Sequence, residues 1–227
     1  MSESPLQSPG AGEDTPPSTD HFVADLACRF RDQVGRTLNF ELDGTPTSLA
    51  VVDHYLSTAR NESRPAILGL LAAGAGAYFG ELLRDHFGAF WIGQTSDPRR
   101  LRILLAPAFI YFAPIDLAYE AIVAGPLSPE DPRHPTGRAL DTGFHLRKKP
   151  ADNRPDEASD HDWIDEQLTH LPPLPAEQFY SLTGRFETLE VIVDRLVSRR
   201  QMQGGAPGLL AVDDYLQTLT EAGPATA

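Results

Sequence analysis

The sequence predicts an α+β fold: a small, mostly antiparallel sheet covered by helices, with a helical C-terminal part. Apolar residues recur at helical spacing over residues 21–38 and 65–87. Short apolar or aromatic runs then follow one another, separated by Gly, Asp-Pro and Pro, as is typical of buried strands. These runs are 89–93, 101–107 and 109–114. The order argues against a doubly wound parallel sheet, which requires strands that alternate with helices.

The N-terminal half of the fold is predicted to be mostly helical. A spacing of four from Phe22 to Val34 places one apolar stripe on a helix over 21–38. A short strand is expected at Asn39–Leu42, with Asp43-Gly44 as its turn. Thr45-Pro46 then predicts an N-cap followed by proline at the first helical position, which starts a second helix.

Glycine and proline mark the ends of the next helices. A third helix is expected from Pro65 to Phe87, where Gly88 stops it. After the strands, Pro114 opens a further helix that ends at Gly125. Each boundary follows from the fixed φ of proline or the freedom of glycine at a C-cap.

The C-terminal part returns to helix. Ser159 with Asp162 three residues later resembles a capping box, and the prolines near 172–175 break the chain afterwards. The clearest helix runs from Phe179 to Leu196. A short internal echo pairs LAVVDHYL at 49–56 with LLAVDDYL at 209–216, which predicts two similar amphipathic helices rather than a repeat architecture.

Composition divides the chain into four parts. Residues 1–20 are an acidic, Pro- and Ser-rich segment that is expected to be a disordered tail. The α+β body is assigned to 21–146, a charged linker to 147–160 and the helical part to 161–221. Most of the negative charge lies in the tail and the linker region, so the packed body is nearly neutral.

Length and charge restrict the class of protein. With 227 residues, 41% of them hydrophobic and 22% charged, the chain has the composition of a folded, soluble protein. The net charge of -13 argues against nucleic acid and anionic membranes as partners, because neutralising phosphate needs a basic surface. The expected partner is a protein or a second copy of the chain.

Cysteine usage and the N-terminal sequence favour a cytoplasmic location. A single cysteine, Cys28, excludes an internal disulfide framework, and its apolar neighbours predict a buried structural thiol. The first residues have no basic and apolar regions of an export signal. The longest apolar stretch, Ala66–Gly80, is shorter than the roughly 20 residues of a membrane span.

A glycine motif allows two interpretations. Gly74, Gly76 and Gly80 have a GxGxxxG spacing that suits a phosphate-binding turn, and Arg99 after the next strand would suit a 2′-phosphate of an NADP-type nucleotide. In the other interpretation the glycines lie within a helix and form a small-residue face for close packing. The Leu- and Ala-rich residues before the motif favour the packing interpretation.

Catalytic and metal-binding patterns are weak. Acidic residues and a histidine at 160–166 stand at helical spacing, but acids in a first helical turn also favour the macrodipole. His54 and His86 have sequence-adjacent carboxylates, which do not face them on a helix. No hydrolase elbow, Walker loop, HExxH or CxxC occurs. The sequence therefore assigns no catalytic residue, no cofactor and no metal site.

The leading hypothesis is a non-enzymatic cytosolic protein that binds protein partners through an aromatic and helical surface. The candidate interaction residues recur at helical spacing near the C-terminus: Phe179, Phe186, Leu189, Val193 and Leu196. This face is expected to dock on its own body or on a second copy. The alternatives are a small nucleotide-dependent enzyme that uses a turn at Gly74–Gly80, and a structural protein that self-assembles through this C-terminal helix.

Two segments carry a resemblance to other proteins. FELDGTPTSLAVVDHYL and LGLLAAGAGAYFGELLRDHFGAFWIG resemble an uncharacterised class of small bacterial α+β domains that share SLxxxDxxL followed by GAYxGExLRxxxGAxW. The resemblance covers residues 39–93 and implies an α+β fold in a bacterial cytosol. It implies no established activity and no catalytic residues. It also supports a packing role for the glycines.

Overall fold

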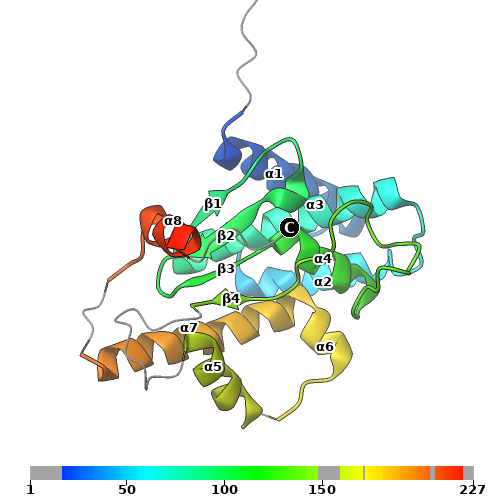
Figure 1. The fold of residues 1–227 in the computed structure, drawn as a ribbon. Helices are drawn as coiled ribbons and strands as arrows, with labels where there is room; N and C mark the ends of the chain where they lie inside the picture. The colour runs from blue at the N-terminus through cyan, green and yellow to red at the C-terminus, as the bar shows by residue number, and fades with distance from the viewer. Residues whose placement is uncertain (1–16, 148–158, 171, 205–207, 222–227) are drawn as a thin grey trace, which may run out of the picture.

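The computed structural model describes residues 17–147, 159–170, 172–204 and 208–221 (Figure 1). The helices are α1 (Thr19–Leu38), α2 (Leu49–Ser57), α3 (Pro65–Phe87), α4 (Pro114–Val123), α5 (Asp160–Thr169), α6 (Ala176–Tyr180), α7 (Leu182–Met202) and α8 (Val212–Glu221). The strands are β1 (Ala89–Ile92), β2 (Arg102–Leu105), β3 (Ile110–Phe112) and β4 (His145–Leu146), and two short 3-10 helices lie at Pro46–Ser48 and Pro98–Arg100. The predicted α+β class is confirmed.

The four strands form one antiparallel sheet in the order β1-β2-β3-β4. The first three coincide with the predicted apolar runs. β4 was missed by the sequence analysis, because two residues of strand are too short to show a period-2 pattern. It comes after a loop of about 20 residues that follows α4.

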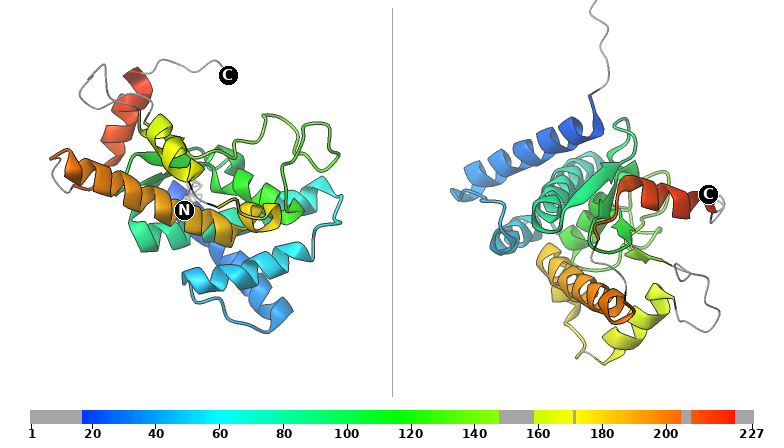
Figure 2. Two further views of the ribbon diagram at one scale, coloured as in Figure 1. Left: turned by 90° about the horizontal axis from the view of Figure 1, so that it is seen from below. Right: turned by 90° about the vertical axis from the view of Figure 1, so that its left-hand side faces the viewer.

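The sheet has a helix layer on each face. Its inner face carries Trp91, Ile103, Leu105, Ile110 and Phe112, which join one hydrophobic core with the helices. α1 packs on α3, and α3 packs on α4. Figure 2 (right) shows α8 in red on the side of the sheet opposite α1 and α3.

α3 is the central helix of the core. Of the described helices it alone has the length and composition of a membrane-crossing segment, yet most of its apolar window is buried inside the protein. Its burial identifies it as a core helix, in agreement with the expectation of a soluble protein. Gly88, at a φ of +72°, ends it as predicted.

Two local predictions in the N-terminal half are wrong. Asn39–Leu42 forms no strand; Leu42 is buried through irregular backbone instead. Asn39 has a left-handed φ of 51° and ends α1, so the chain reverses there. Cys28 is exposed rather than buried, because the buried stripe of α1 follows Val23, Ala27 and Phe30.

The helices α5 and α7 belong to the same core as the body. α7 packs on α2 and α4, and its apolar side chains join the main cluster. Ser159 caps α5 as predicted, since its hydroxyl oxygen accepts from the Asp162 amide at 3.1 Å; the hydroxyl itself donates to the Asp162 carboxylate at 2.7 Å. The predicted helix from Phe179 is interrupted at Ser181, which caps α7 separately from α6. Most of the predicted linker 147–160 and tail 1–20 lies outside the described residues.

Candidate functional site: the outer face of the sheet

The predicted nucleotide-binding turn does not form. Gly74, Gly76 and Gly80 lie in the interior of α3, so no loop presents backbone amides to a phosphate. A Cβ at Gly80 would lie 2.1 Å from the Trp91 ring, and one at Gly76 would lie 2.5 Å from the Ile115 backbone. The glycines allow close packing of α3, which confirms the second interpretation of the motif.

The guanidinium of Arg99 is already hydrogen-bonded within the protein. Its guanidinium donates to Asp116 and to the carbonyl oxygens of Thr136, Arg138 and Ala139. The predicted role in binding a 2′-phosphate is therefore not supported by the geometry, because the same donors already hold a loop.

The predicted interaction face of α7 is turned toward the body. Phe186, Leu189, Val193 and Leu196 are all buried in the main core. Of the two docking alternatives, the structure shows docking on the chain's own body. Phe179 lies on α6, is partly exposed, and has the Arg185 guanidinium 4.4 Å from its ring centroid.

Arg185 belongs to a buried ion pair. Its Nη2 lies 2.8 Å from a carboxylate oxygen of Glu120, so the pair joins α7 to α4. Burial raises the pKa of Glu120, and the positive charge of Arg185 opposes that shift. The pair fixes the C-terminal helices on the body.

The residues that carry the resemblance contact one another. Tyr78 bonds Ser48 through their hydroxyls at 2.6 Å, and Glu81 accepts from the Trp91 indole at 2.9 Å. Asp53 accepts from the amides of Leu182 and Thr183 at 2.8 and 3.0 Å and so caps α7. The two motifs therefore hold the fold together.

The outer face of the sheet carries a row of large side chains. The register aligns Phe90, Leu104, Tyr111 and His145 across the four strands. The Tyr111 and His145 rings stack with centroids 4.8 Å apart. α8 covers the middle of the row, while Phe90 stays exposed and His145 partly so.

Tyr215 anchors α8 on this row. Its ring stacks on Phe109 with centroids 4.3 Å apart, and its side chain is fully buried. Its hydroxyl lies within 3.1 Å of the carbonyl oxygens of Leu105, Ala108 and Ile110, and it accepts from the Ile110 amide at 2.9 Å. Burial raises the pKa of Tyr215 well above its ordinary value, so the phenol is neutral when docked.

We call the turn between β2 and β3 that surrounds this hydroxyl, residues 105–110, the tyrosine socket. Its backbone groups converge on one point because the chain turns around Pro107. A buried amide or carbonyl without a partner costs free energy, so the socket is specific for a group that both donates and accepts. A neutral phenol meets that requirement.

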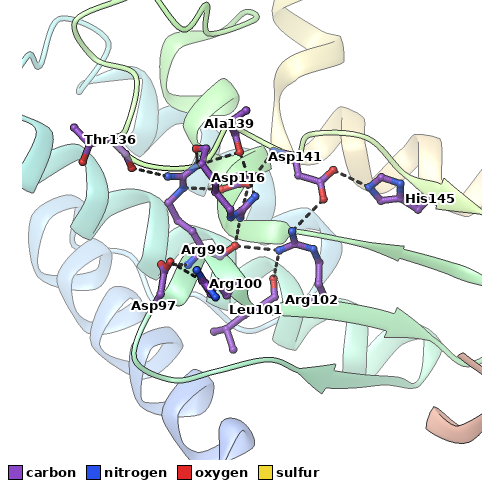
Figure 3. A network of polar contacts seen from close by, with 11 residues as sticks. Asp97, Arg99, Arg100, Leu101, Arg102, Asp116, Thr136, Ala139, Asp141 and His145 are labelled. Atoms are coloured by element: carbon purple, nitrogen blue, oxygen red, sulfur yellow. Dashed lines mark hydrogen bonds and ion pairs between the residues drawn. The ribbon is translucent and has the colours of Figure 1, made fainter. Parts of the chain in front are cut away.

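A polar network fixes the far end of the row (Figure 3). Asp116 on α4 is fully buried; one oxygen lies 3.0 Å from Arg99 Nε, and the other lies 2.7 Å from Arg138 Nη2 and accepts from the Asp141 amide. The carboxylate therefore holds the loop before β4 against the body. An aspartate at a helix N-terminus also suits the macrodipole.

Asp141 links this polar network to the sheet. Its oxygens lie 2.7 Å from His145 Nε2 and 3.1 Å from Arg102 Nη2. Burial alone would raise the pKa of Asp141, but the hydrogen bond from His145 and the charges of Arg102 and Arg138 outweigh it and lower that pKa. The Asp141–His145 pair thus sets the ring that stacks on Tyr111.

The network resembles part of an acid–base device but lacks the reacting group. A histidine oriented by a carboxylate becomes a general base when a hydroxyl or thiol lies beside it. No described contact joins His145 to a serine, threonine or cysteine. Within the described residues no group of three or more His, Cys, Asp or Glu is placed to hold a metal ion. The arrangement orients an aromatic surface.

Comparison with protein family models, curated proteins and solved structures finds no match. The site is therefore interpreted from its own chemistry. The sequence predicts an aromatic and helical interaction surface, but it gives no sign of Tyr215 as an anchor or of the Asp116 network. The internal echo at 209–216 was the one signal that could have pointed to Tyr215.

Proposed function

We propose that this protein is a non-enzymatic protein-interaction module that binds an amphipathic, tyrosine-bearing helix on the outer face of its sheet. The observation that carries the proposal is the tyrosine socket, whose backbone surrounds one buried hydroxyl: the hydroxyl accepts from the Ile110 amide, and three carbonyl oxygens lie within reach of its single proton. α8 is the helix that occupies this site within the same chain.

Charge supports the choice of an acidic helix. Asp214 stands in the first turn of α8. Arg147 lies over the Phe109 ring at 5.0 Å, and the Arg200 guanidinium donates to the Gly208 carbonyl oxygen at 3.1 Å. A basic rim around an aromatic row fits an acidic helix with an unmodified tyrosine. We include a cytoplasmic location in the proposal, which the single cysteine supports.

Binding of a peptide tests the docking site. The probe is a fluorescent peptide of residues 208–221, titrated against the full-length Tyr215→Ala variant and the wild type. We expect saturable binding to the variant and at least about tenfold weaker binding to the wild type, whose own helix competes at high effective concentration. Circular dichroism confirms that the variant is folded.

Matched control peptides distinguish specific binding in the tyrosine socket from non-specific hydrophobic binding. The control peptide carries alanine in place of Tyr215, and a second one replaces exposed Asp213 with asparagine. The proposal requires the first control to lose binding and the second to retain most of it. Equal binding of all peptides, or no preference for the variant protein, would show that the sheet face is not a helix-docking site.

A further inference from the structure

The segment that docks on the sheet begins before α8. The Leu210 amide donates to the carbonyl oxygen of Ala106 at 2.7 Å. Ala106 lies in the tyrosine socket next to Leu105, whose carbonyl oxygen is 2.6 Å from the Tyr215 hydroxyl. The same turn therefore binds the docked segment at two points, once through a main-chain amide and once through a phenol five residues later.

Aliphatic side chains fill the space between these two points. Leu210 and Val212 are partly buried and pack against the buried cluster that contains Tyr215. The residues between and before them, Ala211 and Leu209, are exposed. Alternate residues thus face the sheet until the helix begins at Val212, which is the pattern of an extended segment.

Asp214 fixes the residue at which the helix begins. Its carboxylate accepts from the Ala211 amide at 2.7 Å, three residues earlier. An acidic side chain at the third helical position commonly reaches back to the N-cap amide in this way. Because the aspartate holds the Ala211 amide, the helix starts at Val212, and Leu210 stays extended with its amide directed at Ala106.

α2 supplies a comparison within the same chain, because its LAVVDHYL pattern lacks both features. It has Ala50 where the docked segment has Leu210, and His54 where the docked segment has Asp214. Its helix starts at Leu49, three residues earlier in the pattern than α8 does. The residues that the two patterns share therefore do not determine the docked conformation.

We propose that the docking site recognises one kind of protein segment, Leu-x-Val-x-Asp-Tyr, and that a partner which binds this site carries such a segment. The aliphatic residues, five and three positions before the tyrosine, cover the sheet. The carboxylate directly before the tyrosine sets the change from extended chain to helix, so that one amide and one phenol reach the same turn. This inference rests on the proposed helix-docking function and names the class of segment that the site accepts.

Substituted peptides test each feature of the segment. The receptor is the full-length Tyr215→Ala protein, and the parent probe is the fluorescent 208–221 peptide. In the peptide, Leu210→Ala removes apolar contact and Asp214→Ala removes the bond that fixes the helix start, so each should bind about tenfold more weakly. Ala211→Val is the matched control at an exposed side chain and should bind like the parent.

A peptide from α2 provides a gain-of-binding test. The peptide of residues 48–61 has the same length and the same spacing of valine and tyrosine as the parent. It should bind at least about tenfold more weakly, because it lacks the leucine and the aspartate. Ala50→Leu with His54→Asp in this peptide should restore the affinity to within about threefold of the parent.

The intact chain gives an independent readout. The Ile110 amide donates to the Tyr215 hydroxyl, so its hydrogen exchange reports docking of α8 itself. Leu210→Ala or Asp214→Ala in the otherwise wild-type protein should speed this exchange about tenfold, whereas Ala211→Val should leave it unchanged. Unchanged exchange in both of the first two variants would contradict the proposed role of these residues.

The outcomes distinguish this inference from the function on which it rests. If the parent peptide binds but its Leu210→Ala and Asp214→Ala forms bind equally well, the docking site stands and the segment specificity is wrong. If the 48–61 peptide binds as tightly as the parent, or if its double substitution gains nothing, the specificity is again wrong. If the parent peptide itself does not bind, the proposed function fails first.

Discussion

α2 and α8 share a sequence pattern but have different positions in the molecule. LAVVDHYL in α2 and LLAVDDYL before and within α8 place Leu, Val, Asp, Tyr and Leu at the same spacing. In α2 the apolar members are all buried in the main core. In the C-terminal copy Tyr215 is buried but both leucines are exposed. The same local signal thus gives a core helix in one place and a surface helix in the other.

The partners of the two tyrosines explain the difference. The Tyr55 hydroxyl accepts from Gln33 at 2.6 Å, and its ring meets Phe30 edge-on, so α2 is tied to side chains of α1. The Tyr215 hydroxyl binds only backbone groups of a turn. The Tyr215 hydroxyl thus depends on the backbone of one turn, whereas the Tyr55 hydroxyl depends on a side chain of another helix.

The largest expected difference concerns the last leucine of the pattern. Leu56→Ala should lower the free energy of unfolding by about 3 kcal/mol, because it leaves a cavity in the core. Leu216→Ala should change it by less than about 0.5 kcal/mol at an exposed site. Denaturant unfolding measures both. Equal costs would show that α8 is part of the cooperative core.

Substitution of the two aspartates of the pattern, Asp53 and Asp213, should give the next largest difference in stability. Asp53→Ala removes the acceptor of two amides and of the Thr183 hydroxyl at the start of α7, and we expect a loss of about 2 kcal/mol in stability. Asp213→Ala removes only an exposed charge in the first turn of α8, with an expected loss of about 0.5 kcal/mol or less. Thermal unfolding compares the pair. A smaller effect for Asp53 would mean that water replaces its hydrogen bonds.

Substitution of Tyr215 and of Tyr55 tests which region of the protein loses stability. Tyr215→Phe removes the hydroxyl that accepts from the Ile110 amide and donates its one proton to the surrounding carbonyl oxygens, so docking of α8 should weaken by about 1–3 kcal/mol. Hydrogen exchange should rise in α8 and in the socket while the denaturant midpoint of the body stays unchanged. Tyr55→Phe should instead lower the global midpoint slightly. Protection lost throughout the body of Tyr215→Phe would contradict the separation of the two regions.

The smallest effect is a dependence on alkaline pH. A free tyrosine ionises near its ordinary pKa of 10, whereas burial keeps the docked Tyr215 neutral. A raised pKa in the docked state means that docking is fully favourable below pH 10 and weakens as pH rises, by up to about tenfold per pH unit. Binding of the 208–221 peptide to the Tyr215→Ala protein measures this, and a peptide with phenylalanine at that position should show no such loss.

Local signals in the sequence predicted the elements well. Proline at the start and glycine at the end gave α3 its bounds, Pro114 opened α4, and Ser159 capped α5. These features act within one turn of the helix, so they can be read without the rest of the chain. The failures at Asn39–Leu42 and Cys28 came from tertiary context, which decided which face of α1 was covered and how the chain left it.

The candidate site was much less accessible to sequence analysis. The tyrosine socket joins positions more than 100 residues apart, and it uses backbone groups whose direction no side-chain pattern encodes. The Asp116 network likewise collects two arginines and an amide from separate loops. Such groups carry no periodic signal, because their meeting depends on the path of the chain.

The sequence by itself determined most of the helices, the first three strands, the α+β class and the near-neutral body with its acidic flanks. Only the tertiary structure decided that the glycines pack against Trp91 and Ile115, that the α7 face is buried, and that one copy of the internal echo is a core helix while the other is a surface helix. The physical reason is the distance along the chain over which each interaction acts. Propensity, capping and periodicity act between neighbours in the chain, whereas burial depends on which distant surface is available to cover a given face.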